Sequence, residues 1–274
     1  MDHNRLLVNL AYYQDVPVQP LCQFPTYKIL YVTHGSMRID ISNRSFYIGP
    51  DTLLCMNNLE EQRLFLSERP CFRYLVSLNP TAFDLSIADP QLIAIFKNPF
   101  SERNIFPTAS IAPVIKALFR DLAEEFSHQD KYSESMLCGL VHRLMVTISR
   151  TFPASFTELT TGIQTTVFSA QQYIEKHFQD PLRVGDVASR FFLSQSYLTH
   201  CFKEYTGYTP MQYLNLCRLS YSKSLLLSTN LSINEIALQS GFGDVNNFIR
   251  AFKKQYQTTP GQLRREVSLQ FAPI

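Results

Sequence analysis

Two stretches near the C-terminal end place polar and basic side chains on one face of a helix. A helix beginning at residue 195 turns Leu198 and Phe202 inward and leaves four side chains outward: Gln195, Ser196, Thr199 and His200. A helix beginning at residue 245 turns Phe248 and Phe252 inward and leaves another four outward: Val245, Asn246, Ile249 and Arg250. An amide can pair with an adenine edge, a guanidinium with guanine, and aliphatic groups with thymine methyl groups. Both faces are therefore candidates for reading bases in duplex DNA.

Five further side chains near these faces are candidates for contacts with phosphates. They are Ser194, Lys203, Lys253, Lys254 and Arg264. The alternative interpretation of such basic residues is solvated surface. Arg218 is expected to anchor its own helix by pairing with a nearby carboxylate rather than to contact DNA.

The two stretches belong to a repeated unit. An offset of 49 aligns the apolar positions of 184–193 with those of 233–242, and an offset of 50 aligns 198–210 with 248–260. So many matched apolar positions indicate a tandem repeat with one residue inserted in a turn. Each copy has the pattern of a helix-turn-helix, in which a small residue lets two helices cross closely. Gly241 supplies the residue that tolerates unusual backbone angles in the second turn.

Capping residues predict where the helices of this region begin. Ser194 and Asp244 precede the two candidate base-reading helices as N-caps, and Ser232 with Glu235 forms a capping box. Thr-Pro pairs at 209–210 and 259–260 are typical of an N-cap followed by proline. The predicted helices are 184–190, 195–206, 210–228, 233–240, 245–256 and 261–266. The helix over 210–228 joins the two copies and sets their separation.

The sequence of this region resembles that of a known family. "SQSYLTHCFKEYTGYTPMQYLNLCRL" and "SINEIALQSGFGDVNNFIRAFKKQYQTTPGQLRR" closely resemble the DNA-binding domain of the AraC/XylS family of bacterial transcription regulators, over residues 167–266. The resemblance implies seven helices and two recognition helices that enter successive major grooves. Phe192 stands where many members have glycine, and His200 stands where many have arginine. Both departures lie in the first copy.

The N-terminal half has the pattern of short strands followed by two helices. Residues 20–80 alternate runs rich in Ile, Val, Tyr and Phe with turn clusters, which favours a small antiparallel barrel or sandwich. Residues 111–150 contain two amphipathic stretches with a short polar connection, which predicts an antiparallel helical hairpin. The second stretch has an apolar stripe: Leu137, Leu140, Val141, Leu144 and Ile148. This stripe either covers the barrel or forms a dimer contact.

The order of elements in the N-terminal half also agrees with what the family resemblance implies, a cupin-like barrel that senses a small molecule. Compared with sugar-sensing members, four residues fall at ligand-holding or pocket-lining positions: His34, Arg63, Arg73 and Leu75. Arg73 and Leu75 are two residues apart on one strand and so face the same side. Such a pocket suits a polyhydroxylated or anionic effector. Alternatively, His34 is a turn residue, and Arg63 and Arg73 point into solvent.

Composition and spacing disfavour several other classes of protein. The six cysteines and six histidines are scattered without zinc-ligand spacing, so we expect no metal and no cofactor. Hydrophobic residues are 45% and charged residues 18%, without a long apolar run, and the N-terminus lacks a signal pattern. Residues 163–274 contain 11 Lys/Arg and 7 Asp/Glu, net +4, whereas 1–162 contain 14 and 16, net −2. This difference is weak support for a polyanionic partner of the C-terminal part.

The expected fold class is α+β with two domains. Residues 1–150 form a cupin-like antiparallel β-barrel with a helical hairpin, residues 151–164 a linker, and residues 165–268 an all-α domain with two helix-turn-helix units joined by a linker helix. The expected function is a cytoplasmic, nucleoid-associated and dimeric activator that binds double-stranded DNA, responds to a small-molecule effector, has no membrane partner and contacts RNA polymerase. The alternatives are a barrel that serves only protein contacts, or an enzyme with an appended DNA-binding domain. Nothing around Cys22, Cys55 or Cys71 resembles the reactive cysteine cluster that such an enzyme needs, so no catalysis is expected.

Overall fold

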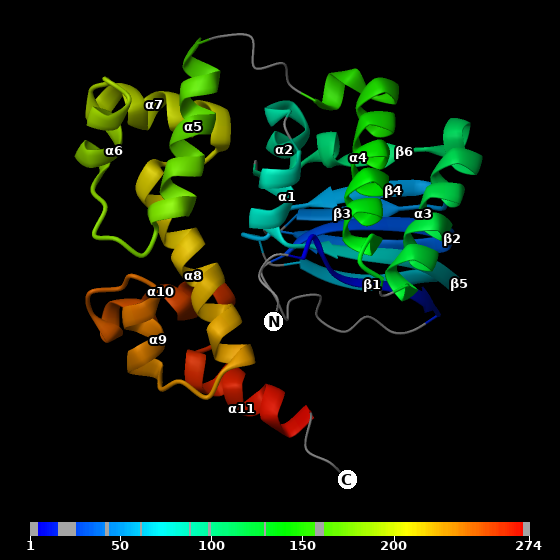
Figure 1. Cartoon of the computed structure of the whole chain (residues 1–274). Coiled ribbons are helices and arrows are strands. Elements are labelled where there is room, and N and C mark those ends of the chain that lie inside the picture. The colour runs from blue at the N-terminus through cyan, green and yellow to red at the C-terminus, as the bar shows by residue number, and fades with distance from the viewer. Residues whose placement is uncertain are drawn as a thin grey trace. The chain divides into compact units, whose positions relative to one another are not determined.

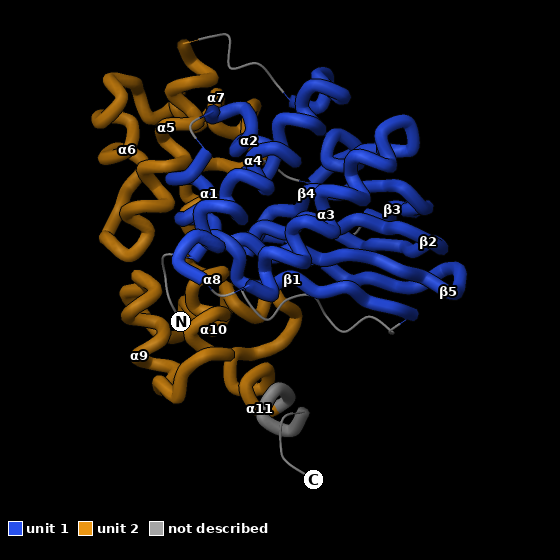
Figure 2. Tube along the Cα trace, turned by 45° about the vertical axis from the view of Figure 1, so that its right-hand side comes forward, with its two compact units in different colours: residues 1–22, 26–159 blue, residues 23–25, 160–274 orange. Residues whose placement is uncertain are grey.

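A computed structural model describes most of the chain as two compact units. The described residues are 5–15, 26–41, 44–60, 62–87, 89–97, 100–128, 130–156 and 162–270, with side chains up to 265 at the C-terminal end. Among them, unit 1 holds the residues up to 156 and unit 2 those from 162 onward (Figure 2). Unit 1 contains an antiparallel sheet with helices, and unit 2 is helical, so the expected two-domain α+β fold class is confirmed. Of the predicted linker, residues 157–161 lie outside the described residues.

Six antiparallel strands form the sheet of unit 1. They are β1 (Leu7–Gln14), β2 (Tyr27–Ile41), β3 (Arg44–Ile48), β4 (Thr52–Met56), β5 (Gln62–Leu78) and β6 (Ile105–Pro107). The order is β1-β5-β2-β4-β6, with β3 paired to β2 (Figure 1). The turns at 49–51 and 57–58 coincide with predicted turn clusters, whereas β2 continues with shifts of register through the turn predicted at 34–36. Residues 42–43, where another turn was predicted, lie outside the described residues.

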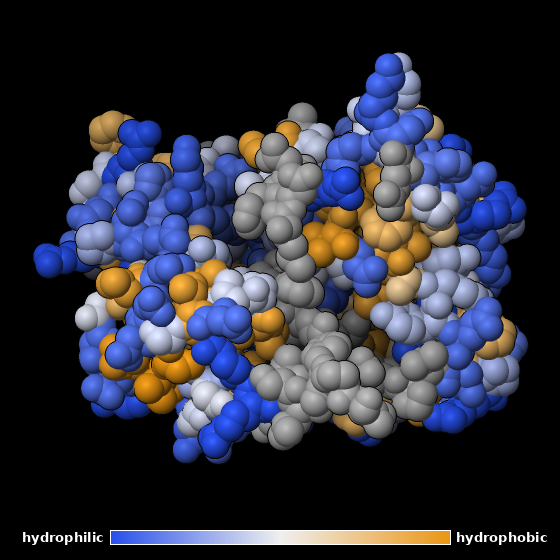
Figure 3. Space-filling model, turned by 60° about the horizontal axis from the view of Figure 1, so that its bottom comes forward, coloured by the Kyte–Doolittle hydropathy of each residue, from blue (hydrophilic) through white to orange (hydrophobic). Residues whose placement is uncertain are grey.

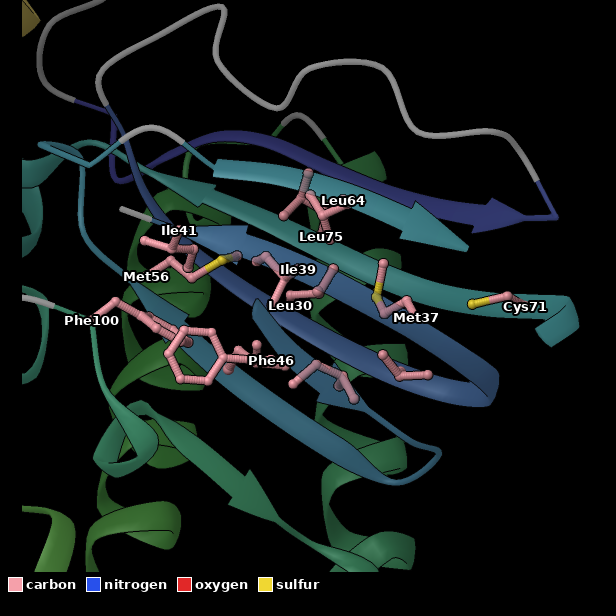
Figure 4. Packing of buried hydrophobic residues seen from close by; sticks show 13 residues of the cluster. Leu30, Met37, Ile39, Ile41, Phe46, Met56, Leu64, Cys71, Leu75 and Phe100 are labelled. Atoms are coloured by element: carbon pink, nitrogen blue, oxygen red, sulfur yellow. The ribbon is translucent and has the colours of Figure 1, made fainter. Parts of the chain in front are cut away.

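One face of this sheet encloses an apolar cluster. The pairing of β2 with β5 shifts register between Val32 and Met37, where both long strands bend. A side chain at Gly35, with φ of +74°, would meet the carbonyl oxygen of Pro70 at 2.4 Å, so only glycine allows this approach. Leu30, Ile39 and Phe46 lie among the thirteen buried residues gathered on this face (Figure 4).

Helices cover the opposite face of the sheet. Unit 1 contains α1 (Pro80–Ser86), α2 (Pro90–Lys97), α3 (Ala112–Ser127) and α4 (Ser133–Thr151), with short 3-10 turns at 102–104, 109–111 and 153–155. Helices α3 and α4 pack side by side as the predicted antiparallel hairpin (Figure 1). The ring of Phe119 on α3 stacks on Tyr31 of β2, with 5.0 Å between ring centroids.

The stripe predicted as a possible dimer contact is used inside unit 1. Leu137 is 6% exposed, and Val141, Leu144 and Ile148 have no exposed surface, while Leu140 is half-buried. Four of the five side chains are therefore unavailable to a second chain. An amphipathic pattern reports that a helix face is covered, but not what covers it.

A polar contact ties α3 to the sheet at Asp51. Its Oδ1 accepts hydrogen bonds from the Tyr31 hydroxyl and the Lys116 ammonium, each at 2.8 Å. Partial burial acts to raise the pKa of Asp51, but the bonds from Lys116 and Tyr31 outweigh it and hold this pKa below its usual value. Burial and the neighbouring carboxylate raise the pKa of Tyr31. The turn between β3 and β4 is thereby fixed to β2 and α3.

Unit 2 contains seven helices among its described residues. They are α5 (Gly162–His177), α6 (Val184–Arg190), α7 (Gln195–Thr206), α8 (Pro210–Ser228), α9 (Ile233–Gln239), α10 (Val245–Tyr256) and α11 (Pro260–Gln270). The predicted bounds of α6, α7, α8 and α10 are confirmed. Helix α9 ends one residue earlier than predicted, α11 is longer, and α5 begins inside the segment predicted as a linker.

The predicted caps of unit 2 are confirmed. The Ser194 hydroxyl accepts from the backbone of Tyr197, and the Asp244 carboxylate accepts from the backbones of Asn246 and Asn247. Ser232 and Glu235 form the predicted capping box. These bonds satisfy backbone N–H groups that a helix start leaves without partners.

The surface drawn in Figure 3 is largely hydrophilic, with hydrophobic residues in separate groups. Large exposed hydrophobic side chains of unit 2 include Phe192, Tyr197 and Leu238. Among the residues that the structure describes, no helix is both long and apolar enough to cross a membrane.

Candidate nucleic-acid interface

The two copies of the repeated unit have the same internal packing. In the first, the Leu193 amide donates to the Ala188 carbonyl at 3.0 Å, and Leu198 and Phe202 are buried. In the second, the Phe242 amide donates to the Ala237 carbonyl at 2.9 Å. Phe248 and Phe252 are likewise buried, in the positions of Leu198 and Phe202. Helices α6 and α7, and α9 and α10, are therefore two copies of one helix-turn-helix.

The turns of the two copies share a backbone conformation but not a residue type. Gly241 has φ of +81°, and Phe192 at the matching position has φ of +57°. The Phe192 side chain is 98% exposed. At Gly241 a side chain would meet the Phe178 carbonyl oxygen at 2.7 Å and Gln179 at 2.9 Å. Glycine is thus required in the second turn, whereas the first turn accommodates Phe192 only with backbone strain.

Helix α8 is anchored by Arg218, although not to a carboxylate as the sequence had led us to expect. Its guanidinium donates to the backbone carbonyls of Phe178 and Asp180, each at 2.7 Å. It also lies 5.9 Å from the centroid of the Phe242 ring. Burial lowers the pKa of Arg218, yet arginine remains charged at neutral pH. The anchor therefore links α8 to the end of α5 and to the second helix-turn-helix.

The predicted outward face of α7 lines a surface hollow of about 750 Å³. The hollow is lined by Val184, Gln195, Ser196, Thr199, His200, Lys203 and Glu204. It brings together all four residues that we predicted to contact bases from the first copy and one of the predicted phosphate contacts. Gln195 lies close to Gly185 of α6, where a side chain would approach its amide nitrogen to 2.7 Å.

The predicted face of α10 is part exposed and part packed. Asn246 and Arg250 are exposed, whereas Val245 and Ile249 are half-buried against the core of the second copy. The Arg250 guanidinium donates to the side-chain oxygen of Asn247, one turn earlier. Asn247 is exposed, and our interpretation of the sequence missed it. Its position three residues before Arg250 was the available signal.

The predicted phosphate contacts are mostly exposed side chains. Lys203, Lys253 and Lys254 are exposed. The Ser194 hydroxyl accepts from the Tyr197 amide at the start of α7. Arg264 on α11 is half-buried.

The structure separates the four residues that we predicted to line an effector pocket. Arg73 and Leu75 are buried on the enclosed face of β5, as their spacing predicted, and the Arg73 guanidinium lies 5.0 Å from the centroid of the Tyr13 ring. His34 and Arg63 are exposed. His34 sits in the irregular part of β2 with its ring 5.6 Å from that of Phe72, and Arg63 alternates with the buried Leu64. His34 and Arg63 therefore do not line the enclosed face.

The described residues contain no group of three or more His, Cys, Asp or Glu side chains arranged to hold a metal ion. The side chains of Cys55, Cys71, Cys201 and Cys217 are buried. Burial raises the pKa of Cys55 and, against the opposing effect of Arg73, that of Cys71.

Comparison with known proteins agrees with this geometry. A family model described as a helix-turn-helix domain matches residues 187–266, which span both copies. The transcriptional activator RhaS of Enterobacter sp. (strain 638) is 24% identical over 261 residues, covering 93% of each chain. RhaS of Salmonella schwarzengrund is also 24% identical, over 91% of this chain and 90% of its own. These matches support the resemblance of the sequence to the AraC/XylS family of DNA-binding transcription regulators.

Solved structures of another protein, ToxT, share the fold of both units. ToxT from Vibrio cholerae O395 has a TM-score of 0.58 at 15% identity and covers 95% of this chain and 98% of its own. ToxT of strain SCE256, crystallised with an unsaturated fatty acid, has a TM-score of 0.57 at 19% identity, over 95% and 92% of the two chains. The shared fold therefore extends over unit 1 as well as unit 2.

The two turns generate a paired prediction for stability. Phe192→Gly should stabilise unit 2 by about 0.5–1 kcal/mol, because relief of the left-handed strain exceeds the added freedom of the unfolded chain. Gly241→Ala should destabilise it by about 2 kcal/mol or more, because its Cβ meets backbone atoms. Urea unfolding followed by circular dichroism, with hydrogen exchange to locate the change in unit 2, measures both. Changes of the same sign in the two variants would contradict the account.

Proposed function

We propose that this AraC/XylS-type regulator activates transcription by placing α7 and α10 in two successive major grooves under the control of a small molecule bound in unit 1. The observation that carries the proposal is the shared burial pattern of α7 and α10. In both helices the same positions face inward, and the polar and basic residues at the other positions face out. Two helix-turn-helix copies with the same packing, joined by α8, fit two successive segments of duplex DNA.

The outward residues divide by chemistry into base-reading and phosphate-binding groups. Arg250 suits a guanine edge and Asn246 an adenine edge, while the methyl groups of Val245 and Ile249 suit thymine. In the first copy Gln195, Ser196, Thr199 and His200 take the corresponding positions. Lys203, Lys253 and Lys254 follow on the same faces and suit phosphates.

Substitutions in the two groups should have different signatures. Arg250→Ala should weaken binding to a selected operator by about 1–3 kcal/mol and blur preference at one base pair. Lys203→Ala should weaken binding to operator and random duplexes alike, with a shallower dependence of log K on log salt. Fluorescence anisotropy on both DNAs at several salt concentrations makes the comparison. Equal losses on both DNAs for Arg250→Ala, or an unchanged salt slope for Lys203→Ala, would reject the respective assignment.

The proposed effector site is the enclosed face of the sheet in unit 1. Arg73 places a buried cation there, beside Leu75 and the apolar cluster. The ToxT structures include complexes with an unsaturated fatty acid and with (E)-4-(8-methylnaphthalen-1-yl)but-3-enoic acid. An apolar face with one guanidinium suits an anionic molecule with an apolar body better than a polyhydroxylated one, because a sugar would leave many hydrogen bonds unmade. The sugar-like effector suggested by the sequence is thus the second choice.

A ligand panel tests the effector proposal on the full chain. Apolar carboxylic acids should raise the melting temperature of unit 1, and monosaccharides should not, because only a molecule that binds the folded state stabilises it. Arg73→Met should lose the response to acids while remaining folded by circular dichroism. Stabilisation by sugars alone would reverse the choice of effector. If no molecule stabilises the chain, unit 1 serves protein contacts instead.

The proposal extends to how the regulator works in the cell. The effector would act by binding one arrangement of the two units more tightly than another, since only differential affinity shifts such an equilibrium. We place the regulator in the cytoplasm on the nucleoid, as a homodimer that contacts RNA polymerase and has no catalytic role. The dimer surface would lie on the exposed side of the hairpin, because four of the five stripe residues are buried within unit 1.

A further inference from the structure

The two recognition helices differ in charge although they match in packing. Helix α7 (Gln195–Thr206) carries Lys203 and Glu204, a net charge of zero, whereas α10 (Val245–Tyr256) carries Arg250, Lys253 and Lys254, a net charge of +3. The offset of 50 aligns Lys203 with Lys253 and Glu204 with Lys254. All four of these side chains are exposed. The difference therefore lies on the surface, where it affects an approaching polyanion and not the fold.

Glu204 lies on the candidate DNA-binding face of the first copy and not beside it. It lines the same hollow as His200 and Lys203, together with the other predicted base contacts of α7. Its carboxylate lies 3.8 Å from Nε2 of His200, and the two side chains are 58% and 77% exposed. At this distance and exposure the pair contributes little to the stability of the helix. The carboxylate is therefore not explained by the packing of the first copy.

We propose that Glu204 weakens the binding of the first helix-turn-helix to DNA. The second copy then supplies most of the electrostatic affinity, and the first copy binds only where the DNA sequence matches it. The inference rests on the proposed placement of α7 and α10 in the grooves. A carboxylate facing the duplex repels phosphates and partly cancels the attraction of Lys203. In the second copy Lys254 at the same position adds a phosphate contact. Sequence-independent affinity therefore comes mainly from α10. Contacts from Gln195, Ser196 and Thr199 to the bases decide whether the first copy also binds DNA.

The test changes the charge at matched positions in the full chain. Binding of Glu204→Gln and Glu204→Lys to a random-sequence duplex is measured by fluorescence anisotropy over a range of salt concentrations. Lys254→Gln is measured beside them. Glu124→Lys, on the exposed side of α3 in unit 1, adds the same charge as Glu204→Lys and serves as the control. Circular dichroism confirms that each variant is folded.

The expected results are distinct for each variant. Glu204→Gln should bind random duplex about threefold more tightly, and Glu204→Lys about tenfold more tightly with a salt slope steeper by about 0.9, which is one added phosphate contact. Lys254→Gln should bind more weakly with a slope shallower by about the same amount. Glu124→Lys should bind like the unmodified chain. On DNA selected for the first copy, Glu204→Lys should reduce discrimination between matched and mismatched half-sites.

Two outcomes would overturn the inference. Unchanged affinity and salt slope in both Glu204 variants would show that the carboxylate does not face the duplex. An equal rise in affinity for random duplex in Glu124→Lys would show an effect of net charge alone. A failure of the proposed function looks different. In that case Lys254→Gln and Arg250→Ala would also leave DNA binding unchanged, because neither recognition helix would lie at the interface.

Discussion

The arrangement of unit 2 depends on the hydrogen bonds between Arg218 and the carbonyls of Phe178 and Asp180. These carbonyls belong to the segment that leaves α5 and leads into the first helix-turn-helix. Arg218 lies on α8, which leads into the second. The same segment also touches the second copy directly, because the Gln179 amide donates to the Gln239 carbonyl at 2.8 Å and Gly241 lies against Gln179. Hydrogen bonds to charged groups are worth about 1.5–3 kcal/mol each. This contact can therefore hold the two helix-turn-helix copies in one orientation, where α8 alone would leave them free to bend.

A shared interior with different surfaces allows the two copies to take the unequal roles that we propose. Ala188 and Ala237, and Phe202 and Phe252, maintain the same crossing of helices in both copies. The outer positions are not constrained by that packing and have diverged, as His200 against Arg250 and Glu204 against Lys254 show. The strained Phe192 in the first turn belongs to the same divergence, because its side chain is 98% exposed, whereas a side chain at Gly241 would meet backbone atoms. The packing of the two copies is thus the same, while their outward side chains differ.

The helices of unit 2 could be predicted from the sequence because their ends are fixed by local chemistry. Ser194, Asp244 and Ser232 cap helices within three residues of themselves, and Pro210 and Pro260 begin them. The partners of Arg218 could not be predicted in this way, because they are backbone carbonyls about forty residues away that only the fold brings close. The stripe on α4 was amphipathic as expected, but a pattern does not say whether the sheet or a second chain covers it.

In unit 1 the sequence was informative where the side chains of a strand alternate between the two faces of the sheet, and uninformative elsewhere. Arg73 and Leu75 were correctly placed on one side of β5 because side chains in a strand alternate strictly. His34 and Arg63 were assigned by resemblance alone, and the bend of β2 and the alternation around Leu64 put them outside. Strand β1 and helices α1 and α2 were missed, although Asn79 caps α1 directly ahead of Pro80, a local signal of the kind that was used in unit 2.

The most direct test of the account is the dependence of DNA binding on the spacing between the two half-sites. Operators selected from a random duplex pool would be altered by inserting half a helical turn or one full turn, about five or ten base pairs, between the half-sites. If Arg218 and its neighbours hold the two copies as one rigid pair, both insertions should reduce affinity to that of a single half-site. Binding that survives the full-turn insertion undiminished would contradict the account, because it would mean that the two copies move independently.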